Sequence, residues 1–299
     1  EHGWVLDEQQ GRPFIKAALD AGINFFDTAN IYSDGASEEV LGRAILDFAV
    51  RDDVVLSTKV HGKMRDTVNG GGLSRKAIFA EVDVSLRRLG TEFVDILQIH
   101  RWDYETPIEE TLEALDTVVR QGKVRYLGAS SMHAWQFMKA LGLQRANGWA
   151  PFVMMQNHVN LLYREEEREM LPLCRSEGIG VTPWSPLARG RLTRSANSHR
   201  ESARFATDSV GARYYAKASE ADDEIINRVG KLAERRERSR AEIALSWLLH
   251  KPGISAPVVG ATKPHHLEAA LAAVELSLDP DEIAFLEEPY VPRPISGHS

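Results

Sequence analysis

The sequence predicts an α/β protein built as a (β/α)8 barrel, or TIM barrel, with a long insertion before the last strand. Two observations support this prediction. Seven short β-rich runs recur, mostly about thirty residues apart, which is the spacing of βα units. Amphipathic helical patterns fill the gaps, and strands joined by helices pair in parallel. We therefore expect residues 1–299 to form one barrel domain, with a seven-stranded open or permuted sheet as the alternative.

The β-rich runs follow one another along most of the chain. They are Ile23–Ala29, Val54–Val60, Val94–His100, Val124–Ser130, Phe152–Asn157, Gly180–Trp184 and Ala256–Gly260. A closed barrel of this type has eight strands, one more than these runs supply. Because a helix-like segment, residues 8–19, precedes the first run, we expect the missing first strand to lie upstream of Glu1.

Start and stop signals mark helices in the gaps between the runs. Ser37 is predicted to cap one helix, and Ser74 begins another helix that Gly90 ends. Pro107 stands in the first turn of a third helix, since proline is favoured at that position.

The gap before the last run is far longer than the others. It contains a polar, arginine-rich stretch, residues 191–220, followed by helical patterns over residues 223–238 and 241–250. We expect this insertion to form a mobile lid over the cofactor or the substrate. A solvated surface loop is the alternative.

Composition excludes several classes of protein. The net charge of −7 provides no basic face for nucleic acid or a membrane surface. No apolar run approaches the roughly 18 residues of a membrane span, and no signal peptide is recognisable, so we expect a cytoplasmic protein. The single cysteine, Cys174, excludes an intramolecular disulfide and is expected to be buried. His265 and His266 are adjacent and lack supporting ligands, so no metal site is predicted, and the sequence indicates no oligomeric state.

Three ionisable residues stand at the ends of buried β-rich runs, where the desolvation of a charge is costly. They are Asp27, Lys59 and His100, and the C-terminal ends of barrel strands meet at the active site. Tyr32 follows in the loop after Asp27. A free phenol is a weak acid, and a nearby ammonium makes it a better proton donor. Asp27 would hold Lys59 charged, and His100 would position a carbonyl oxygen. A buried Asp27–Lys59 ion pair and a core His100 are the alternatives.

Four motifs together resemble the aldo-keto reductase family over nearly the whole chain. They are Gly-Ile-Asn-Phe-Phe-Asp-Thr-Ala with a later Tyr, Ser-Thr-Lys-Val, Asp-Ile-Leu-Gln-Ile-His, and Trp-Ser-Pro-Leu-Ala-Arg-Gly. This resemblance implies a (β/α)8 barrel, NADPH as the cofactor, and a catalytic tetrad of Asp27, Tyr32, Lys59 and His100. Hydride would pass from the nicotinamide to a carbonyl carbon, and Tyr32 would protonate the oxygen. The chain also resembles a bacterial, NADPH-dependent branch linked to chemistry that gives 1-deoxyxylulose 5-phosphate.

The nucleotide must be held without a glycine-rich phosphate loop, because neither GxGxxG nor GxxxxGK[ST] follows a strand. Ser130, Ser131 and Gln156 at strand ends are candidates to bind the carboxamide, although the family usually has Asn at the position of Ser131. Trp184 stands where the family places an aromatic residue that stacks on the nicotinamide. A small-residue loop with two cations, residues 185–191, then suits the pyrophosphate; its candidates are Ser185, Leu187, Gly190 and Arg191.

A second anion site is predicted where a helix begins near Pro264, since helix N-terminal amides bind phosphate. Lys263 adds a charge suited to the 2′-phosphate of NADPH. The candidates are Gly260, Thr262, Lys263 and His266. Ala269 and Ala270 depart from the Glu and Asn with which the family commonly contacts adenine.

Trp102 and Tyr104, in the loop after His100, are the candidate substrate-facing residues. We expect an NADPH-dependent reductase of a small-molecule aldehyde or ketone with Tyr32 as general acid. One alternative uses Lys59 as a Schiff-base nucleophile, as barrel aldolases do. Others are a sugar-phosphate conversion giving 1-deoxyxylulose 5-phosphate and a cofactor-bound regulatory subunit resembling potassium-channel β subunits.

Overall fold

The computed structural model of the protein describes residues 5–195, 214–215 and 219–298, which fall into two compact units. The first unit contains residues 7–156, 176–179 and 298, and the second contains the described residues of 1–6, 157–175 and 180–297. The single-domain organisation expected from the sequence stays a prediction. Over the described part of the chain, no helix combines the length and the apolar character that crossing a membrane demands.

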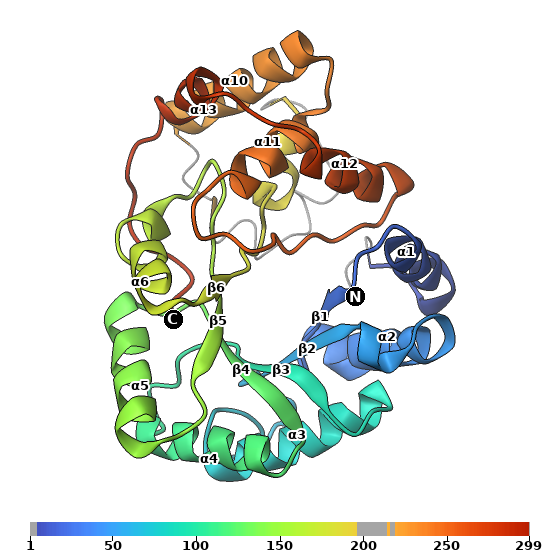
Figure 1. Ribbon diagram of the computed structural model, residues 1–299, viewed down its shortest axis with the longest axis vertical. Helices are drawn as coiled ribbons and strands as arrows, with labels where there is room; N and C mark the ends of the chain where they lie inside the picture. Colours follow the sequence, from blue (N-terminus) through green and yellow to red (C-terminus); the bar gives the residue numbers. More distant parts are fainter. Residues whose placement is uncertain (1–4, 196–213, 216–218, 299) are drawn as a thin grey trace. The chain divides into compact units, whose positions relative to one another are not determined.

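The first unit consists of parallel strands that alternate with helices. The strands pair with their sequence neighbours, so that Phe26 of one strand lies beside Leu56 of the next and Lys59 lies beside Gln98. The helices lie along the outer side of the strands (Figure 1). In chain order the elements are α1 (Glu8–Asp20), β1 (Phe25–Asp27), η1 (Tyr32–Gly35), α2 (Ala36–Phe48), η2 (Arg51–Asp53), β2 (Val55–Val60), α3 (Arg75–Leu89), β3 (Val94–Ile99), α4 (Ile108–Arg120), β4 (Val124–Ser130), α5 (Ala134–Asn147) and β5 (Phe152–Gln156).

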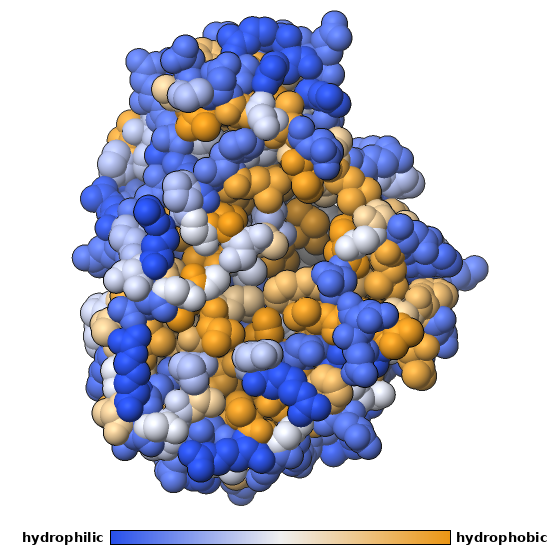
Figure 2. Space-filling view, viewed as in Figure 1, coloured by the Kyte–Doolittle hydropathy of each residue, from blue (hydrophilic) through white to orange (hydrophobic). Residues whose placement is uncertain are grey.

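Burial on both faces explains why these strands contain so few alternating polar residues. Leu56, Leu97 and Leu127 of the strands are buried, as are Leu112 and Leu115 of α4 that pack on the same core. Figure 2 shows hydrophilic residues along the outer helices of this unit and hydrophobic residues gathered over its strands. The apolar face of each helix therefore anchors the sheet, and the strand ends are left to carry polar side chains.

Two of the predicted helix ends are confirmed and two are wrong. The Ser74 side chain accepts a hydrogen bond from the Ala77 amide, and Gly90 ends α3 in the left-handed conformation, with φ 64°. Ser37 does not cap α2, because its hydroxyl bonds the Thr28 hydroxyl at 2.8 Å and Gly35 occupies the cap position. Pro107 is the N-cap of α4 and lies just outside its first turn.

The second unit is mainly helical. Ser219 and Ser239 each form a capping box at the start of a helix, with Asp222 and Glu242 respectively as the reciprocal partners. These two helices confirm the helical patterns predicted over residues 223–238 and 241–250. The elements are η3 (Glu165–Glu167), α6 (Met170–Glu177), which extends into the first unit and contains the buried Cys174, β6 (Gly180–Val181), η4 (Ala188–Thr193), α10 (Glu220–Arg236), α11 (Arg240–Leu249), α12 (Pro264–Val274) and α13 (Pro280–Glu287).

The seventh predicted strand, Ala256–Gly260, is wrong. This segment is extended, and the amides of Ser255 and Val258 donate to the carbonyls of Val181 and Pro183, each at 2.8 Å. Pro257 lacks an amide proton, so a regular ladder cannot continue through it.

The eight-stranded barrel remains a prediction, because the described residues contain six strands. The predicted lid, residues 191–220, lies largely outside the described residues. Only 191–195, 214–215 and 219–220 of that stretch are described.

Candidate active site

Asp27 and Lys59 form a buried ion pair at the C-terminal ends of β1 and β2. The Lys59 side chain is fully buried, and its ammonium donates hydrogen bonds to an Asp27 carboxylate oxygen and, at 2.9 Å, to the Thr28 carbonyl. Burial alone lowers the pKa of Lys59, but the charge of Asp27 and the neighbouring Tyr32 outweigh it and raise this pKa above its ordinary value. Lys59 is therefore charged at neutral pH.

Tyr32 and His100 lie beside this pair. Tyr32 begins η1, a turn in which Ser33 and Asp34 both take positive φ, and its side chain is 40% exposed. Lys59 Nζ lies 5.2 Å from the centroid of the Tyr32 ring. The His100 ring meets the Tyr32 ring edge to face, with the centroids 5.7 Å apart. The structure thus brings all four predicted catalytic residues together within the first unit.

His100 has the electrostatics of a neutral imidazole. Burial and the positive charges of Lys59 and Arg101 hold the pKa of His100 well below its usual range. Its backbone amide donates to the Val60 carbonyl, which fixes the residue just beyond the end of β3. A neutral imidazole can donate one hydrogen bond without carrying charge.

Two glutamines hold Asp27 from the other side. Gln98 Nε2 donates to Asp27 Oδ1 and to the Ser57 hydroxyl, both at 2.7 Å, and Gln156 Nε2 donates to Asp27 Oδ1 at 3.2 Å. Gln156 was predicted as a carboxamide ligand, and this role stays a prediction. Gln98 was missed, although a buried amide two residues before His100, on the same side of the strand, was a usable signal.

Ser130 and Ser131 lie at the end of β4 in the first unit. Both are buried, their hydroxyls lie 3.4 Å apart, and the Ser131 amide donates to the Gln156 carbonyl. Ser131 has a φ of 44°, a conformation that costs energy for a residue with a Cβ. Their assignment to the nicotinamide carboxamide stays a prediction.

The second unit contains the other cofactor candidates, beginning with Trp184. One face of its indole stacks on His158, with the ring centroids 4.1 Å apart and the planes at 8°. Tyr163 stacks on the opposite face of His158 at 4.3 Å. The Tyr215 hydroxyl lies 2.8 Å from His158 Nε2, so the plane of the imidazole, and with it that of Trp184, is fixed.

The predicted pyrophosphate loop is a sequence of tight turns. Ser185, Ala188, Arg189 and Gly190 all take positive φ, and Leu187 precedes η4. The Arg191 side chain is buried; its guanidinium donates to the Tyr215 carbonyl at 3.2 Å and lies 5.3 Å from the centroid of that ring. These contacts give Arg191 a packing role within the second unit, and its contact with a phosphate stays a prediction.

The predicted phosphate site near Pro264 has the expected local form. Pro264 begins α12, Lys263 is its exposed N-cap residue, and Gly260 lies in the exposed segment before it. The Thr262 amide donates to His266 Nδ1 at 3.3 Å, which closes the turn. An ammonium at a helix start fits a phosphate group, although Pro264 supplies no amide and the His266 amide donates to the Lys263 carbonyl at 3.0 Å.

The predicted substrate residues lie in the loop between β3 and α4. Trp102 packs against Trp135 of α5, with the ring centroids 6.3 Å apart, and Tyr104 is 60% exposed. Trp135 was not predicted, because a tryptophan in an amphipathic helix is usually a core residue and periodicity does not distinguish the two.

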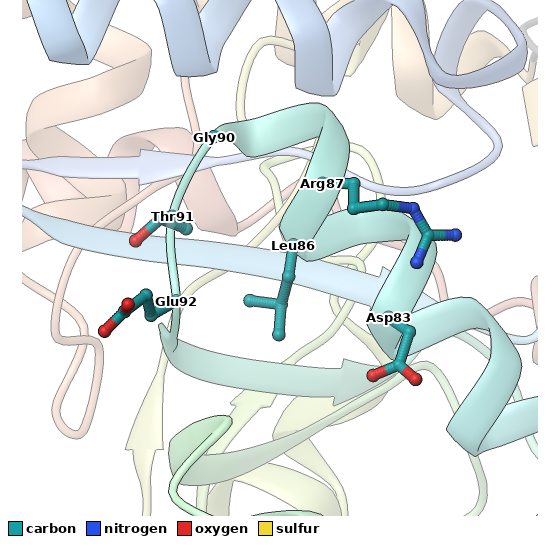
Figure 3. Close-up of a pocket in the computed structure, with 6 residues that line it drawn as sticks. All are labelled: Asp83, Leu86, Arg87, Gly90, Thr91 and Glu92. Atoms are coloured by element: carbon teal, nitrogen blue, oxygen red, sulfur yellow. The ribbon is translucent and has the colours of Figure 1, made fainter.

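A pocket of about 420 Å³ lies elsewhere in the first unit (Figure 3). It is lined by Asp83, Leu86, Arg87, Gly90, Thr91 and Glu92, where α3 turns into β3. This is the N-terminal end of β3, about 20 Å from His100 at a strand rise of about 3.3 Å per residue. It therefore takes no part in the chemistry of the tetrad.

The parallel strand–helix alternation and the cluster of Asp27, Lys59 and His100 at the strand ends define an α/β protein with a buried, charged site at the C-terminal edge of its sheet. The chain belongs to the aldo/keto reductase family, whose model matches residues 1–290.

Relatives of this chain cover nearly all of its length. An aldo-keto reductase of Fusarium vanettenii is 45% identical in an alignment of 319 residues, gaps included, that covers 99% of this chain and 85% of that protein. A Schizosaccharomyces pombe protein named for an aryl-alcohol dehydrogenase is 44% identical, over 98% of this chain and 89% of its own. The versiconal hemiacetal acetate reductase of Aspergillus parasiticus is 44% identical, over 98% of this chain and 90% of that protein.

These findings make the protein an oxidoreductase that acts on carbonyl or CH–OH groups, in a family that generally uses NAD(P)H. The relatives named here are fungal, so they give no support to the bacterial branch or to the link with 1-deoxyxylulose 5-phosphate. The cofactor candidates fit a nicotinamide nucleotide in their chemistry: Trp184 offers a flat ring with a fixed plane, and Lys263 offers a cation at a helix start.

Proposed function

We propose that the protein is an NADPH-dependent reductase of aldehydes or ketones in which Tyr32 is the general acid. The observation that carries this proposal is the position of the charged Lys59 beside the Tyr32 ring, with Asp27 as its counter-ion. A phenol that faces a fixed ammonium can release its proton more easily, because the phenolate is stabilised. The partial exposure of Tyr32 leaves it accessible to a substrate.

Each member of the tetrad has one step in this mechanism. The Tyr32 hydroxyl donates its proton to the carbonyl oxygen of the substrate as negative charge develops there. Lys59 stabilises the phenolate that remains, and Asp27 keeps Lys59 charged and oriented. Gln98 in turn fixes the second carboxylate oxygen of Asp27.

His100 orients the substrate. Since its pKa is well below the usual range, His100 is neutral in the working pH range and donates a hydrogen bond to the carbonyl oxygen without competing as an acid. The edge-to-face contact with Tyr32 keeps the two rings apart at a fixed angle, so both address the same oxygen.

When bound, NADPH supplies the hydride that reduces the carbonyl carbon. We propose that Trp184 stacks on the nicotinamide and that Ser130, Ser131 and Gln156 bind its carboxamide. The Ser185, Leu187, Gly190 and Arg191 segment would contact the pyrophosphate. The phosphate on the adenosine side would bind at the start of α12; the candidates there are Gly260, Thr262, Lys263 and His266.

Aromatic aldehydes are the first substrates to test, because a relative carries the name of an aryl-alcohol dehydrogenase. The Schiff-base alternative is not favoured, since Asp27 raises the pKa of Lys59 and an amine must be neutral to attack a carbonyl. No described residue favours the sugar-phosphate or channel-subunit alternatives, and a sugar phosphate belongs in the substrate panel as a comparison.

The test is the variant Tyr32→Phe, measured by NADPH oxidation with aromatic aldehydes, dicarbonyls and sugar phosphates. We expect kcat to fall by about 10²- to 10⁴-fold, the usual contribution of a general acid. NADPH binding, followed by nucleotide fluorescence, should stay close to that of the unmodified protein. Tyr126→Phe, at an exposed position of β4, is the matched control. Turnover by Tyr32→Phe equal to that of the control would reject the assignment.

A further inference from the structure

An apolar face of α5 is left open in the first unit. Trp135, in the first turn of the helix, is 62% exposed, and Met138, three residues later on the same face, is 38% exposed. Single exposed apolar residues are ordinary, but an exposed indole next to an exposed thioether forms a continuous apolar contact area.

Trp102 extends this face toward the tetrad. It lies two residues beyond His100, and its ring is tilted by 55° to that of Trp135, with the centroids 6.3 Å apart. The three residues Trp102, Trp135 and Met138 are called the aromatic wall below. The tilt leaves the two indoles as adjoining surfaces, and a flat aromatic ring can pack on either of them.

The loop that carries Trp102 is held rigidly. The Asp103 carboxylate accepts hydrogen bonds from the Leu73 amide at 2.7 Å, from the Glu105 amide at 2.9 Å and from the Thr106 hydroxyl at 2.8 Å. These bonds outweigh burial and lower the pKa of Asp103, so its carboxylate stays charged and bonded at neutral pH. A wall that is fixed before binding loses little entropy when a ligand arrives.

The helix side of the wall is held as well. Gln136 Nε2 donates to the Tyr104 hydroxyl at 3.2 Å, and Gln136 Oε1 accepts from the His133 amide at 2.9 Å. One side chain therefore caps α5 and fastens it to the loop that follows His100. Trp102 and Trp135 keep their relative positions through this link.

The order of these residues along the wall gives a length scale. Consecutive Cα atoms are about 3.8 Å apart, so the Trp102 backbone is at most about 8 Å from that of His100. Trp135 stands shortly after the C-terminal end of the neighbouring strand β4, as Trp102 does after β3, and the tetrad lies at this same edge of the sheet. The two indole centroids are 6.3 Å apart, so a fused bicyclic ring can contact both indoles, whereas a single six-membered ring contacts one of them.

We propose that the aromatic wall selects carbonyl substrates with at least two fused aromatic rings and that Trp135 is the specificity-determining residue. The inference rests on the proposed reductase function and deepens it. Met138 lies beside Trp135 and adapts its flexible thioether to the edge of the second ring.

The experiment compares 2-naphthaldehyde with benzaldehyde as substrates in NADPH oxidation. Trp135→Ala should lower the ratio of kcat/KM for 2-naphthaldehyde to that for benzaldehyde by about two- to twelvefold, the value of one aromatic contact. Trp135→Phe keeps a smaller ring and should give an intermediate ratio. Tyr126→Ala is the matched control, because Tyr126 is 58% exposed but lies about 13 Å along β4 from the strand end, at about 3.3 Å per residue. Its ratio should not change.

A direct binding measurement separates this inference from the proposed function. Calorimetric titration of the cofactor-free protein with 2-naphthaldehyde should give a Kd that Trp135→Ala raises by the same factor. If the unmodified protein binds 2-naphthaldehyde through Trp135 but reduces no aldehyde, the proposed reductase function is rejected. The role of the aromatic wall in binding fused aromatic rings is then still supported. If Trp135→Ala lowers kcat/KM for both aldehydes by the same factor, or for neither, the ratio of the two values is unchanged and the inference is overturned. A change in oligomeric state caused by Trp135→Ala would point to a protein contact and overturn it as well.

Discussion

At the scale of single residues, Lys59 decides the chemistry of the site. Its side chain has no contact with solvent, and its charge depends on the Asp27 carboxylate. An uncompensated charge in such a position costs about 3–5 kcal/mol, which the group avoids by losing its proton.

Asp27→Asn should therefore lower the pKa of Lys59 while leaving the size of the site unchanged. Because the phenolate of Tyr32 is then stabilised less, we expect kcat to fall. We also expect the alkaline limb of the profile of kcat against pH to move to lower pH. The measurement is NADPH oxidation between pH 6 and 12, because the pKa of Lys59 in the unmodified protein lies above its ordinary value of 10.5. Asp53→Asn, at an exposed position before β2, is the control. An alkaline limb that stays in place in Asp27→Asn would show that the carboxylate does not govern the charge of Lys59.

The sequence indicates three members of the tetrad because each is an ionisable residue at or near the end of a β-rich run. Asp27, Lys59 and His100 stand at the ends of runs that are rich in apolar residues, and the structure places them together as expected. Gln98 leaves only the weak signal of an amide two residues before His100, and Trp135 breaks no pattern that one sequence reveals. An amide within a strand and a tryptophan within a helix both have ordinary structural uses, so only their neighbours in space show what they contact.

At the scale of elements, the packing of α2 against α3 depends on the absence of a side chain at Gly42. A Cβ built there would lie 2.3 Å from the Leu89 carbonyl oxygen and 2.6 Å from the Leu89 Cα. The obstacle is backbone at the end of α3, which cannot rotate away. Gly42→Ala should therefore destabilise the protein by about 1–3 kcal/mol through overpacking, measured as a lower urea midpoint.

Gly142→Ala supplies the matched control for this prediction. Gly142 lies inside α5, and a Cβ there would meet nothing within 4 Å. The same change should stabilise this helix by about 0.5–1 kcal/mol, since alanine loses less backbone entropy on folding. Opposite signs for the two variants are expected. A stabilising effect of Gly42→Ala would show that α3 can move away from α2.

The elements themselves follow from the sequence only where local signals agree with tertiary contacts. Ser74 and Gly90 bound α3 as predicted, because nothing competes for their cap positions. Ser37 fails as a cap because its hydroxyl is bonded to that of Thr28, the residue just after β1. The Ala256–Gly260 run has strand-like composition, but Pro257 interrupts its ladder, because proline has no amide proton to donate between the bonds made by Ser255 and Val258.

At the scale of the whole molecule, a buried carboxylate, Glu165, and a partly buried one, Glu287, tie distant segments of the second unit together. In the second unit Glu287 accepts from the Trp247 indole at 2.8 Å and pairs with Lys251 and Arg164. Glu165 accepts from the Tyr290 hydroxyl at 2.7 Å and from the backbone beyond it. The sequence does not predict these partners, because the residues that pair lie dozens of positions or more apart and no periodicity relates them.

These networks should make the protein sensitive to acid. Burial raises the pKa values of Glu287 and Glu165, but their hydrogen-bond and ion-pair partners outweigh burial and lower both below the ordinary range. A carboxylate whose pKa is lowered by folding stabilises the fold at every pH above about 4.3, which is its pKa in the unfolded chain. This stabilisation is lost as the pH falls through the pKa that the group has in the folded protein. His100 should reduce the stability at a higher pH than the carboxylates do. Its pKa in the folded protein lies well below 6.5, so as the pH falls below about 6.5 this histidine takes up a proton in the unfolded chain but not in the folded protein, and the stability declines.

We therefore expect the urea midpoint to be constant near neutral pH, to fall gradually below about pH 6.5 and to fall steeply below about pH 4.3. Glu287→Gln removes one carboxylate from the network. It should lower the midpoint at pH 7, where the lost ion pairs count fully, and make the steep acid limb shallower, because one fewer proton is taken up on unfolding. Glu275→Gln, at an exposed position after α12, should reproduce the unmodified curve. Parallel acid limbs for Glu287→Gln and the unmodified protein would mean that Glu287 contributes no linked proton. The acid sensitivity would then have to come from other groups, such as His100.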